Sequence, residues 1–146
     1  MIEGVKFYGS PLQPRQPKER PMAFGRRRGA ELKEEWAKIP ADVDVLLTHT
    51  PPATILDVSP YTGKPIGCEE LLKALTKKAP AVHVFGHVHN GYGSLAKPKT
   101  LFINASTAVE RRGAQGTINP PVSFWVQKKA DRKGSSAGML ITAAAP

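Results

Sequence analysis

Two short apolar runs separated by a helical pattern constrain the fold of this chain more than any other feature. The first run covers 43–47 and the second covers 81–85, and both are short enough to be buried strands. Between them, leucines recur at helical spacing within 68–78, with glutamates at its start and lysines at its end, as the helix macrodipole favours. A strand, a helix and a strand in this order form a βαβ crossover, so we expect the two strands to be parallel neighbours.

Further elements extend this pattern on both sides. We expect a strand over 5–8, and an apolar stripe indicates a helix that begins at Ala30 and that Pro40 ends. Two more strands are predicted after the crossover, over 101–105 and 122–126. The predicted fold class is therefore α/β.

The length and composition leave room for one globular domain. The 146 residues include 13 glycines and 14 prolines, which excludes a coiled coil or a simple helix bundle. No apolar run approaches the ~20 residues of a membrane helix, and the first residues lack the pattern of a secretory signal. A single cysteine, Cys68, cannot form an internal disulfide, and we expect it to be a buried small side chain. These features favour a cytoplasmic location.

The net charge of +9 is concentrated in the two arms of the chain. Residues 1–40 carry a net +4 and residues 111–146 carry +5, whereas residues 41–110 are neutral. The first arm contains a basic, proline-rich loop over 10–29, and the second ends in a loose, low-complexity tail over 128–146. Such arms either contact nucleic acid or an acidic partner, or form an ordinary solvated surface.

Three of the four histidines follow predicted strands. His49 comes after the strand over 43–47, and His87 and His89 come after the strand over 81–85. Ligands bind beyond the carboxyl ends of strands in α/β folds, and neutral imidazole is a common ligand of zinc, iron and manganese. A metal site is one interpretation, and ordinary hydrogen-bonded histidines at strand ends are the other. His83 lies inside its strand and is expected to face elsewhere in a structural role.

Several spaced blocks resemble the calcineurin-like metallophosphoesterases, and in particular their small metallophosphoesterase-domain phosphodiesterases. The blocks are DVLLTHTPP at 44–52, GCEELLKAL at 67–75, HVFGHVHNGYG at 83–93 and LFINAST at 101–107. The resemblance implies the C-terminal half of the family's β-sandwich, flanked by helices, with a mixed sheet. The partial domain is expected over 1–127, followed by the tail over 128–146.

The same resemblance implies a dinuclear site for divalent ions such as Mn, Fe, Zn or Mg. By matching motif, His49 and His87 resemble ligands of one metal and His89 resembles a ligand of the other, while Asn104 and Tyr92 resemble substrate-side residues. The Asp-x-His, Gly-Asp-x-x-Asp and Gly-Asn-His blocks of the family do not occur in this sequence. No residue of this chain is therefore assigned as catalytic, and little or no hydrolysis is expected from it alone.

Two functions remain open at this point. The first is a metal-dependent hydrolase that acts on phosphodiesters or nucleotides, with this chain supplying the C-terminal histidines. The second is a non-catalytic binding or scaffold protein whose basic arms contact nucleic acid or an acidic partner. The resemblance also implies an exposed apolar sheet face, so we expect a homo-oligomer or a separate N-terminal half as a partner.

Overall fold

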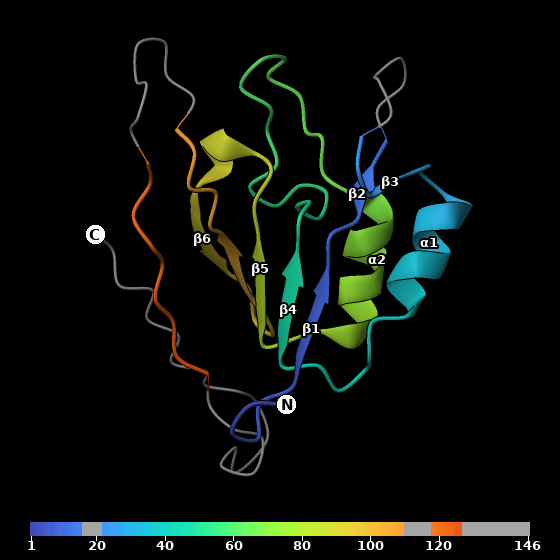
Figure 1. The fold of residues 1–146 in the computed structure, drawn as a ribbon, viewed down its shortest axis with the longest axis vertical. Helices are drawn as coiled ribbons and strands as arrows, with labels where there is room; N and C mark the ends of the chain where they lie inside the picture. The colour runs from blue at the N-terminus through green and yellow to red at the C-terminus, as the bar shows by residue number, and fades with distance from the viewer. Residues whose placement is uncertain (16–21, 110–117, 127–146) are drawn as a thin grey trace.

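A computed structural model describes residues 1–15, 22–109 and 118–126. Its centre is a five-stranded sheet with the strand order β1-β4-β5-β7-β6 (Figure 1). The strands are β1 at Phe7–Ser10, β4 at Val45–Thr48, β5 at Val82–Phe85, β6 at Gly93–Ala96 and β7 at Leu101–Asn104. β1, β4, β5 and β7 are parallel to their neighbours, and β6 pairs antiparallel with β7, so the predicted α/β fold with a mixed sheet is confirmed.

The predicted crossover is confirmed as well. β4 and β5 pair in parallel, with Val45 opposite Val82, and helix α2 at Glu69–Lys78 connects them. Cys68 caps the start of α2, because its Sγ accepts a hydrogen bond from the Leu71 backbone N–H at 3.4 Å. The left-handed backbone of Ala79 ends the helix immediately before Pro80.

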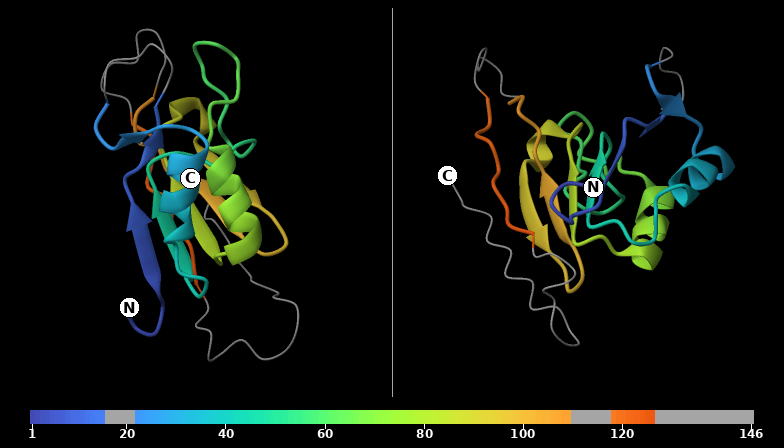
Figure 2. Two further views of the ribbon diagram at one scale, coloured as in Figure 1. Left: turned by 90° about the vertical axis from the view of Figure 1, so that its right-hand side faces the viewer. Right: turned by 60° about the horizontal axis from the view of Figure 1, so that its bottom comes forward.

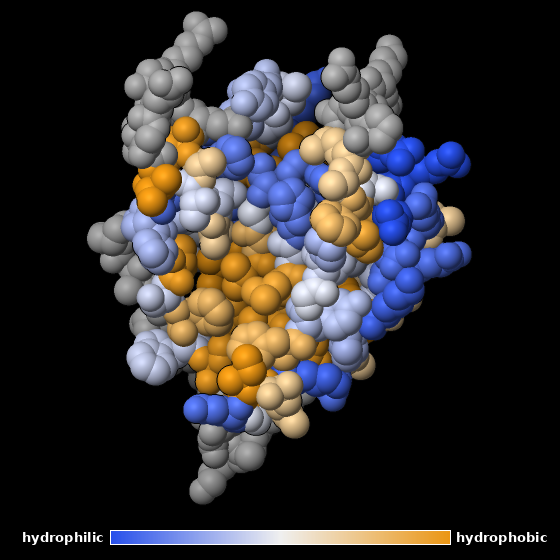
Figure 3. Space-filling view, in the orientation of Figure 1, coloured by the Kyte–Doolittle hydropathy of each residue, from blue (hydrophilic) through white to orange (hydrophobic). Residues whose placement is uncertain are grey.

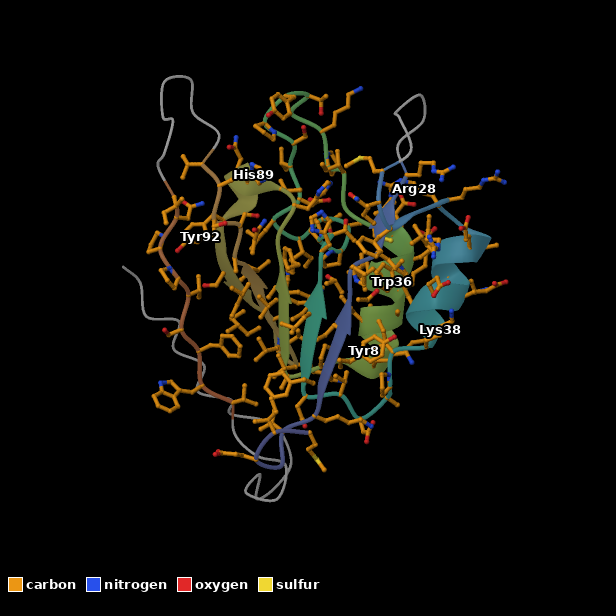
Figure 4. All side chains as sticks on the ribbon, viewed as in Figure 1. Tyr8, Arg28, Trp36, Lys38, His89 and Tyr92 are labelled. Atoms are coloured by element: carbon orange, nitrogen blue, oxygen red, sulfur yellow. The ribbon has the colours of Figure 1, made fainter. Side chains whose placement is uncertain are left out.

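Both helices lie on one side of the sheet. Helix α1 at Ala30–Ala37 packs beside α2, and Figure 2 shows the pair on the side of the sheet opposite residues 118–126. Trp36 points from α1 toward α2 (Figure 4), and its indole Nε1 donates a hydrogen bond to Cys68 Sγ at 3.2 Å. The predicted burial of Cys68 is confirmed, since its side chain is fully buried in this core.

Side-chain alternation gives the sheet two faces of different character. The face under the helices, called here the helix face, carries Leu46, Phe85 and Phe102, which pack with the core of α1 and α2. The opposite face, called here the open face, carries Phe7, Leu47 and other apolar residues: Val45, Val82, Val84, Leu101 and Ile103. Figure 3 shows an apolar surface at the centre of the molecule in this view. The sheet is therefore closed on one face and partly uncovered on the other.

Three sequence predictions about strands need correction. Residues 122–126 form no strand; Val122, Phe124 and Val126 pack their side chains against the open face without joining the hydrogen-bonded ladder. The alternating apolar pattern of 122–126 correctly predicts that these side chains are partly buried, but it wrongly predicts hydrogen-bonded pairing in a strand. β6 was not predicted, because GSLA carries little apolar alternation.

The third correction concerns the basic loop. The predicted loop over 10–29 contains a two-residue parallel ladder between β2 at Gln13–Pro14 and β3 at Gly25–Arg26.

The predicted tail over 128–146 and the boundary at 127 lie outside the described residues. No helix in the described part of the chain is long and apolar enough to span a membrane.

Candidate metal centre

His49 and His87 lie together at the carboxyl ends of two neighbouring strands. His49 follows β4 and His87 follows β5, and the Gly86 N–H donates a hydrogen bond to the His49 carbonyl at 3.1 Å. The backbone of His87 has a φ of 69°, in the left-handed region that non-glycine residues seldom occupy. The parallel register and this local turn bring the two rings to one place.

The two rings are in direct contact. His49 Nε2 and His87 Nδ1 are 3.1 Å apart, and the ring centroids are 4.8 Å apart. Burial lowers the pKa of His87, and the positive charges that His49 and His89 would carry lower it further. Burial also lowers the pKa of His49, with a smaller contribution from His89. Each shift favours neutral imidazole, which is the form that binds metals.

His83 faces away from this pair, on the helix face. It is fully buried, and burial lowers its pKa to about 3. The Thr48 hydroxyl donates its hydrogen to the Thr50 carbonyl at 2.8 Å and lies 2.8 Å from His83 Nε2. With its only hydrogen used, the hydroxyl must accept from His83 Nε2, so His83 is neutral with its proton on Nε2. His83 therefore supports the turn that leads into His49, in agreement with its predicted structural role.

Asn104 holds the loops behind the histidines together. Its fully buried side chain donates from Nδ2 to the Val88 carbonyl at 2.8 Å and to the Leu56 carbonyl at 3.3 Å. Its Oδ1 accepts from the Ser106 N–H at 3.1 Å. All of these bonds go to the backbone, so Asn104 supports the loops around the histidines, while its predicted substrate contact stays a prediction.

Tyr92 connects the end of the site loop to a later segment of the chain. It follows the short 3-10 helix η1 at His89–Gly91, and Figure 4 shows it below His89, beside the segment that contains residues 118–126. Its hydroxyl donates to the Pro120 carbonyl at 2.9 Å. This bond ties the 118–126 segment to the sheet, while the substrate role of Tyr92 stays a prediction.

Two supports of the site were missed in the sequence. Asp57 is buried, and its Oδ2 accepts from the N–H groups of Thr54 at 2.9 Å and Gly67 at 3.1 Å, which closes the loop between β4 and α2. Gly91 has no room for a side chain, since a Cβ there would lie 2.1 Å from the Leu56 carbonyl oxygen. An aspartate in a loop rich in proline and glycine is a turn signal, but sequence alone does not name its partners.

A pocket of about 520 Å³ opens beside the histidines. His87, Val88 and His89 line one side, and residues of β2 and of two loops line the rest: Gln13, Pro14, Met22, Ser59, Pro60, Tyr61, Thr62 and Ile66. Its volume falls within the range of roughly 300–1,000 Å³ that is usual for small-molecule sites.

The histidine pair fits a metal ion as part of a ligand set. Two nitrogens on one tetrahedral ion with bonds of about 2.0–2.1 Å lie about 3.3 Å apart, close to the 3.1 Å between His49 Nε2 and His87 Nδ1. Among the described residues, no three histidine, cysteine, aspartate or glutamate side chains are arranged to hold an ion. The described part of the chain therefore offers two suitable ligands and not a complete site.

Two arginines of the basic loop, Arg26 and Arg28, are used within the fold. Arg28 donates from its guanidinium to the carbonyls of Ile66 and Gly67, both at 2.9 Å. Arg26 lies 3.7 Å from a carboxylate oxygen of Glu31 and 4.0 Å from one of Glu35. Arg26 and Arg28 therefore already have partners within the protein, so fewer charges of the basic cluster are available to a nucleic acid.

Comparison with known proteins gives several relatives that match most of this chain. The chain is 39% identical over 122 residues to metallophosphoesterase domain-containing protein 1 of Homo sapiens, which covers 83% of this chain. It is 43% identical over 122 residues to one UPF0046 protein of Caenorhabditis elegans, again across 83% of this chain. A second UPF0046 protein of that organism is 39% identical over 128 residues, or 88% of this chain. No family model matches the chain.

The chain belongs to the metallophosphoesterase family. The matched segment makes up 36% of the human relative and 29% and 41% of the two nematode relatives, so the chain spans about a third of their length. As a family, the metallophosphoesterases are hydrolases that use divalent metal ions.

Proposed function

We propose that this chain supplies histidine ligands to a metal site that hydrolyses phosphate esters, namely phosphodiesters or nucleotides. The observation that carries the proposal is the contact between His49 and His87 at the strand ends. Two neutral imidazoles in contact beside an open pocket supply two nitrogen ligands for a metal ion. Family membership gives the reaction class.

Each histidine has a defined part in this proposal. His49 and His87 would hold one ion, and His89 would contribute to a second ion. Bound divalent ions supply Lewis-acid stabilisation of the phosphate and a water that ionises near neutral pH. In the overall reaction, the oxygen of water bonds to phosphorus, the ester P–O bond breaks, and the leaving alcohol takes a proton. Asn104 and Asp57 keep the loops around the histidines in place.

The remaining ligands must come from residues other than the described ones. Histidines alone do not neutralise two divalent ions, and carboxylates usually bridge such pairs. We propose that the missing ligands lie on a second sheet, provided by a further part of a longer protein, as the greater length of the relatives supports. The same sheet would cover Phe7 and Leu47, the exposed residues of the open face.

Metal binding gives the first test. We expect the purified chain to bind Zn²⁺ weakly in a calorimetric titration, and His87→Ala and His49→Ala each to weaken that binding at least tenfold. Asn90→Ala is the matched control, because Asn90 is exposed and lies between His89 and Gly91. Unchanged Zn²⁺ binding by both histidine variants would contradict the proposed site.

Activity gives the second test. With bis(p-nitrophenyl) phosphate and Mn²⁺, the chain alone is expected to show little or no hydrolysis. A chimera in which this chain replaces the matching 122 residues of the human relative should hydrolyse the ester, with that relative as the positive control. In the chimera, His87→Ala should lower kcat/KM at least 100-fold, as expected for loss of a metal ligand that supports catalysis.

Three outcomes would change the proposal. Turnover by the isolated chain that His87→Ala abolishes would show that the chain is self-sufficient. A folded but inactive chimera would favour the non-catalytic binding function. A stable homodimer in sedimentation that stops binding a hydrophobic dye would show that a second copy covers the open face.

A further inference from the structure

Helix α2 is flanked by two grooves that share no lining residue with the histidine pocket. The first, of about 790 Å³, lies between α1 and α2, and the second, of about 390 Å³, lies between α2 and the β6–β7 turn. Thr76 lines both grooves, so they adjoin along the C-terminal half of α2. We call the two together the α2 grooves.

The rims of the α2 grooves are strongly basic. Six lysines line them and one acidic residue, Glu70, accompanies these cations; the lysines are Lys33, Lys73, Lys77, Lys78, Lys97 and Lys99. Residues 41–110 as a whole are neutral, so this cluster is a local concentration of charge and not a reflection of the average. Five of the six lysines lie within that neutral segment, and Lys33 belongs to the first basic arm.

Most of these charges are available to a partner. Lys78 is used within the fold, since its Nζ donates to the carbonyls of Ala37 and Ile39. Glu70 accepts from the Gly29 N–H at 3.1 Å. The other five lysines form no ion pair with any described residue, whereas the glutamates Glu31 and Glu35 of α1 lie near Arg26 outside the grooves.

The floor of the grooves is apolar and made largely of small or recessed side chains. Ala37 and Ala74 lie between the helices, and Leu72, Leu75 and Phe102 lie beneath the second groove. Phe102 is buried, so the lining offers no exposed aromatic ring on which a nucleic-acid base could stack. A recessed apolar floor between helices fits the side chains of a peptide.

We propose that the α2 grooves dock an acidic amphipathic segment of a partner protein. Apolar side chains of the segment fill the grooves, and its carboxylates face the lysine rims. Charge complementarity identifies the occupant, because an apolar floor with a cationic rim is matched by apolar side chains flanked by acidic ones. This surface is independent of the histidines and of the proposed hydrolysis.

The test uses a fluorescein-labelled peptide with leucine at every third or fourth position and glutamate elsewhere. We expect fluorescence anisotropy to show saturable binding that weakens with salt. The double variant Lys73→Glu/Lys77→Glu should weaken binding at least tenfold, and Lys97→Glu/Lys99→Glu should weaken it severalfold. The matched control, Arg27→Glu/Lys64→Glu, makes the same charge change at two exposed residues outside the grooves and should stay within twofold of the wild type.

Other outcomes would overturn the proposal. Equal loss in the matched control would show that only net charge attracts the peptide, and no loss in either groove variant would place binding elsewhere. Equally tight binding of a peptide with the same composition in scrambled order would exclude groove recognition. A stronger, Lys73- and Lys77-dependent interaction with a DNA duplex or with phosphatidylserine vesicles would assign the surface to another class of partner. Circular dichroism confirms that each variant is folded.

Discussion

The two faces of the sheet differ in how fully the chain covers their apolar side chains. On the helix face, the chain's own helices bury Trp36 and Leu46 almost completely. On the open face, Phe7 and Leu47 remain 40% and 43% exposed, although side chains of the 122–126 segment, Val5 and Ala105 pack against its apolar cluster. The polar supports of the histidine site, His83 and Asn104, are buried on the helix face. We infer that the helix face sets stability, while the open face is the surface left for association.

The largest expected effect is on the helix face, at Trp36. Trp36→Ala should lower the free energy of unfolding by about 3–5 kcal/mol, because it leaves a cavity and removes the hydrogen bond to Cys68. Trp125→Ala is the matched control: its side chain is 77% exposed, and the change should cost less than about 0.5 kcal/mol. Urea denaturation followed by circular dichroism measures both. Similar losses of unfolding free energy in Trp36→Ala and Trp125→Ala would contradict the conclusion that packing on the helix face sets the stability.

The pH dependence of stability tests the buried histidine of the helix face. Below pH 6.5 the unfolded chain binds a proton at His83 that the folded protein excludes until the pH approaches 3. Stability should therefore fall with falling pH through this window, by up to about tenfold in the folding equilibrium constant per pH unit. In His83→Gln the difference between pH 7 and pH 5 should shrink. An unchanged slope in this variant would show that other groups cause the pH dependence.

A smaller effect is expected where the helix face meets the site. Asn104→Ala removes one side chain that satisfies three backbone groups, and we expect a loss of about 1–3 kcal/mol in urea unfolding. Tyr92→Phe removes a single exposed hydroxyl bond to Pro120 and should cost less than about 1 kcal/mol. Equal losses would mean that the Asn104 bonds do not hold the loops together.

The smallest effect on stability is expected on the open face. Leu46 and Leu47 are consecutive, but they point to opposite faces of the sheet. Leu47→Ser should change the unfolding free energy by less than about 1 kcal/mol and reduce hydrophobic-dye binding and self-association. Leu46→Ser should instead destabilise the protein strongly. Unchanged dye binding in Leu47→Ser would show that the open face is not the surface that the dye detects.

The crossover was predictable from sequence because its physical signals are local. Each strand is an apolar run of a few residues, and α2 combines a leucine stripe with matching charges at its two ends. β6 and the β2–β3 ladder were not predictable in the same way, since their residues carry no apolar period and pair only through contacts distant in the sequence. The 122–126 segment shows the converse: its alternation specifies burial, but it does not specify hydrogen-bonded pairing.

The site was predictable in position and less so in detail. Histidines after parallel strands meet at one sheet edge, which is why the approach of His49 and His87 followed from the strand pattern. The buried state of Asn104 did not follow, because its three partners come from separate loops. The left-handed turn at His87 also had no sequence signal beyond the preceding glycine.

The reactivity of the Cys68 thiol, which caps α2, reports local opening of the core around it. This is the one thiol of the chain, it is fully buried, and burial raises its pKa, so the nucleophilic thiolate is scarce in the native state. Alkylating reagents can reach it only when the core around it, shared by α1, α2 and the loop before α2, opens. The rate of Cys68 labelling by iodoacetamide therefore measures how often this region opens. A ligand that docks across the two helices should lower that rate, because it stabilises the closed state.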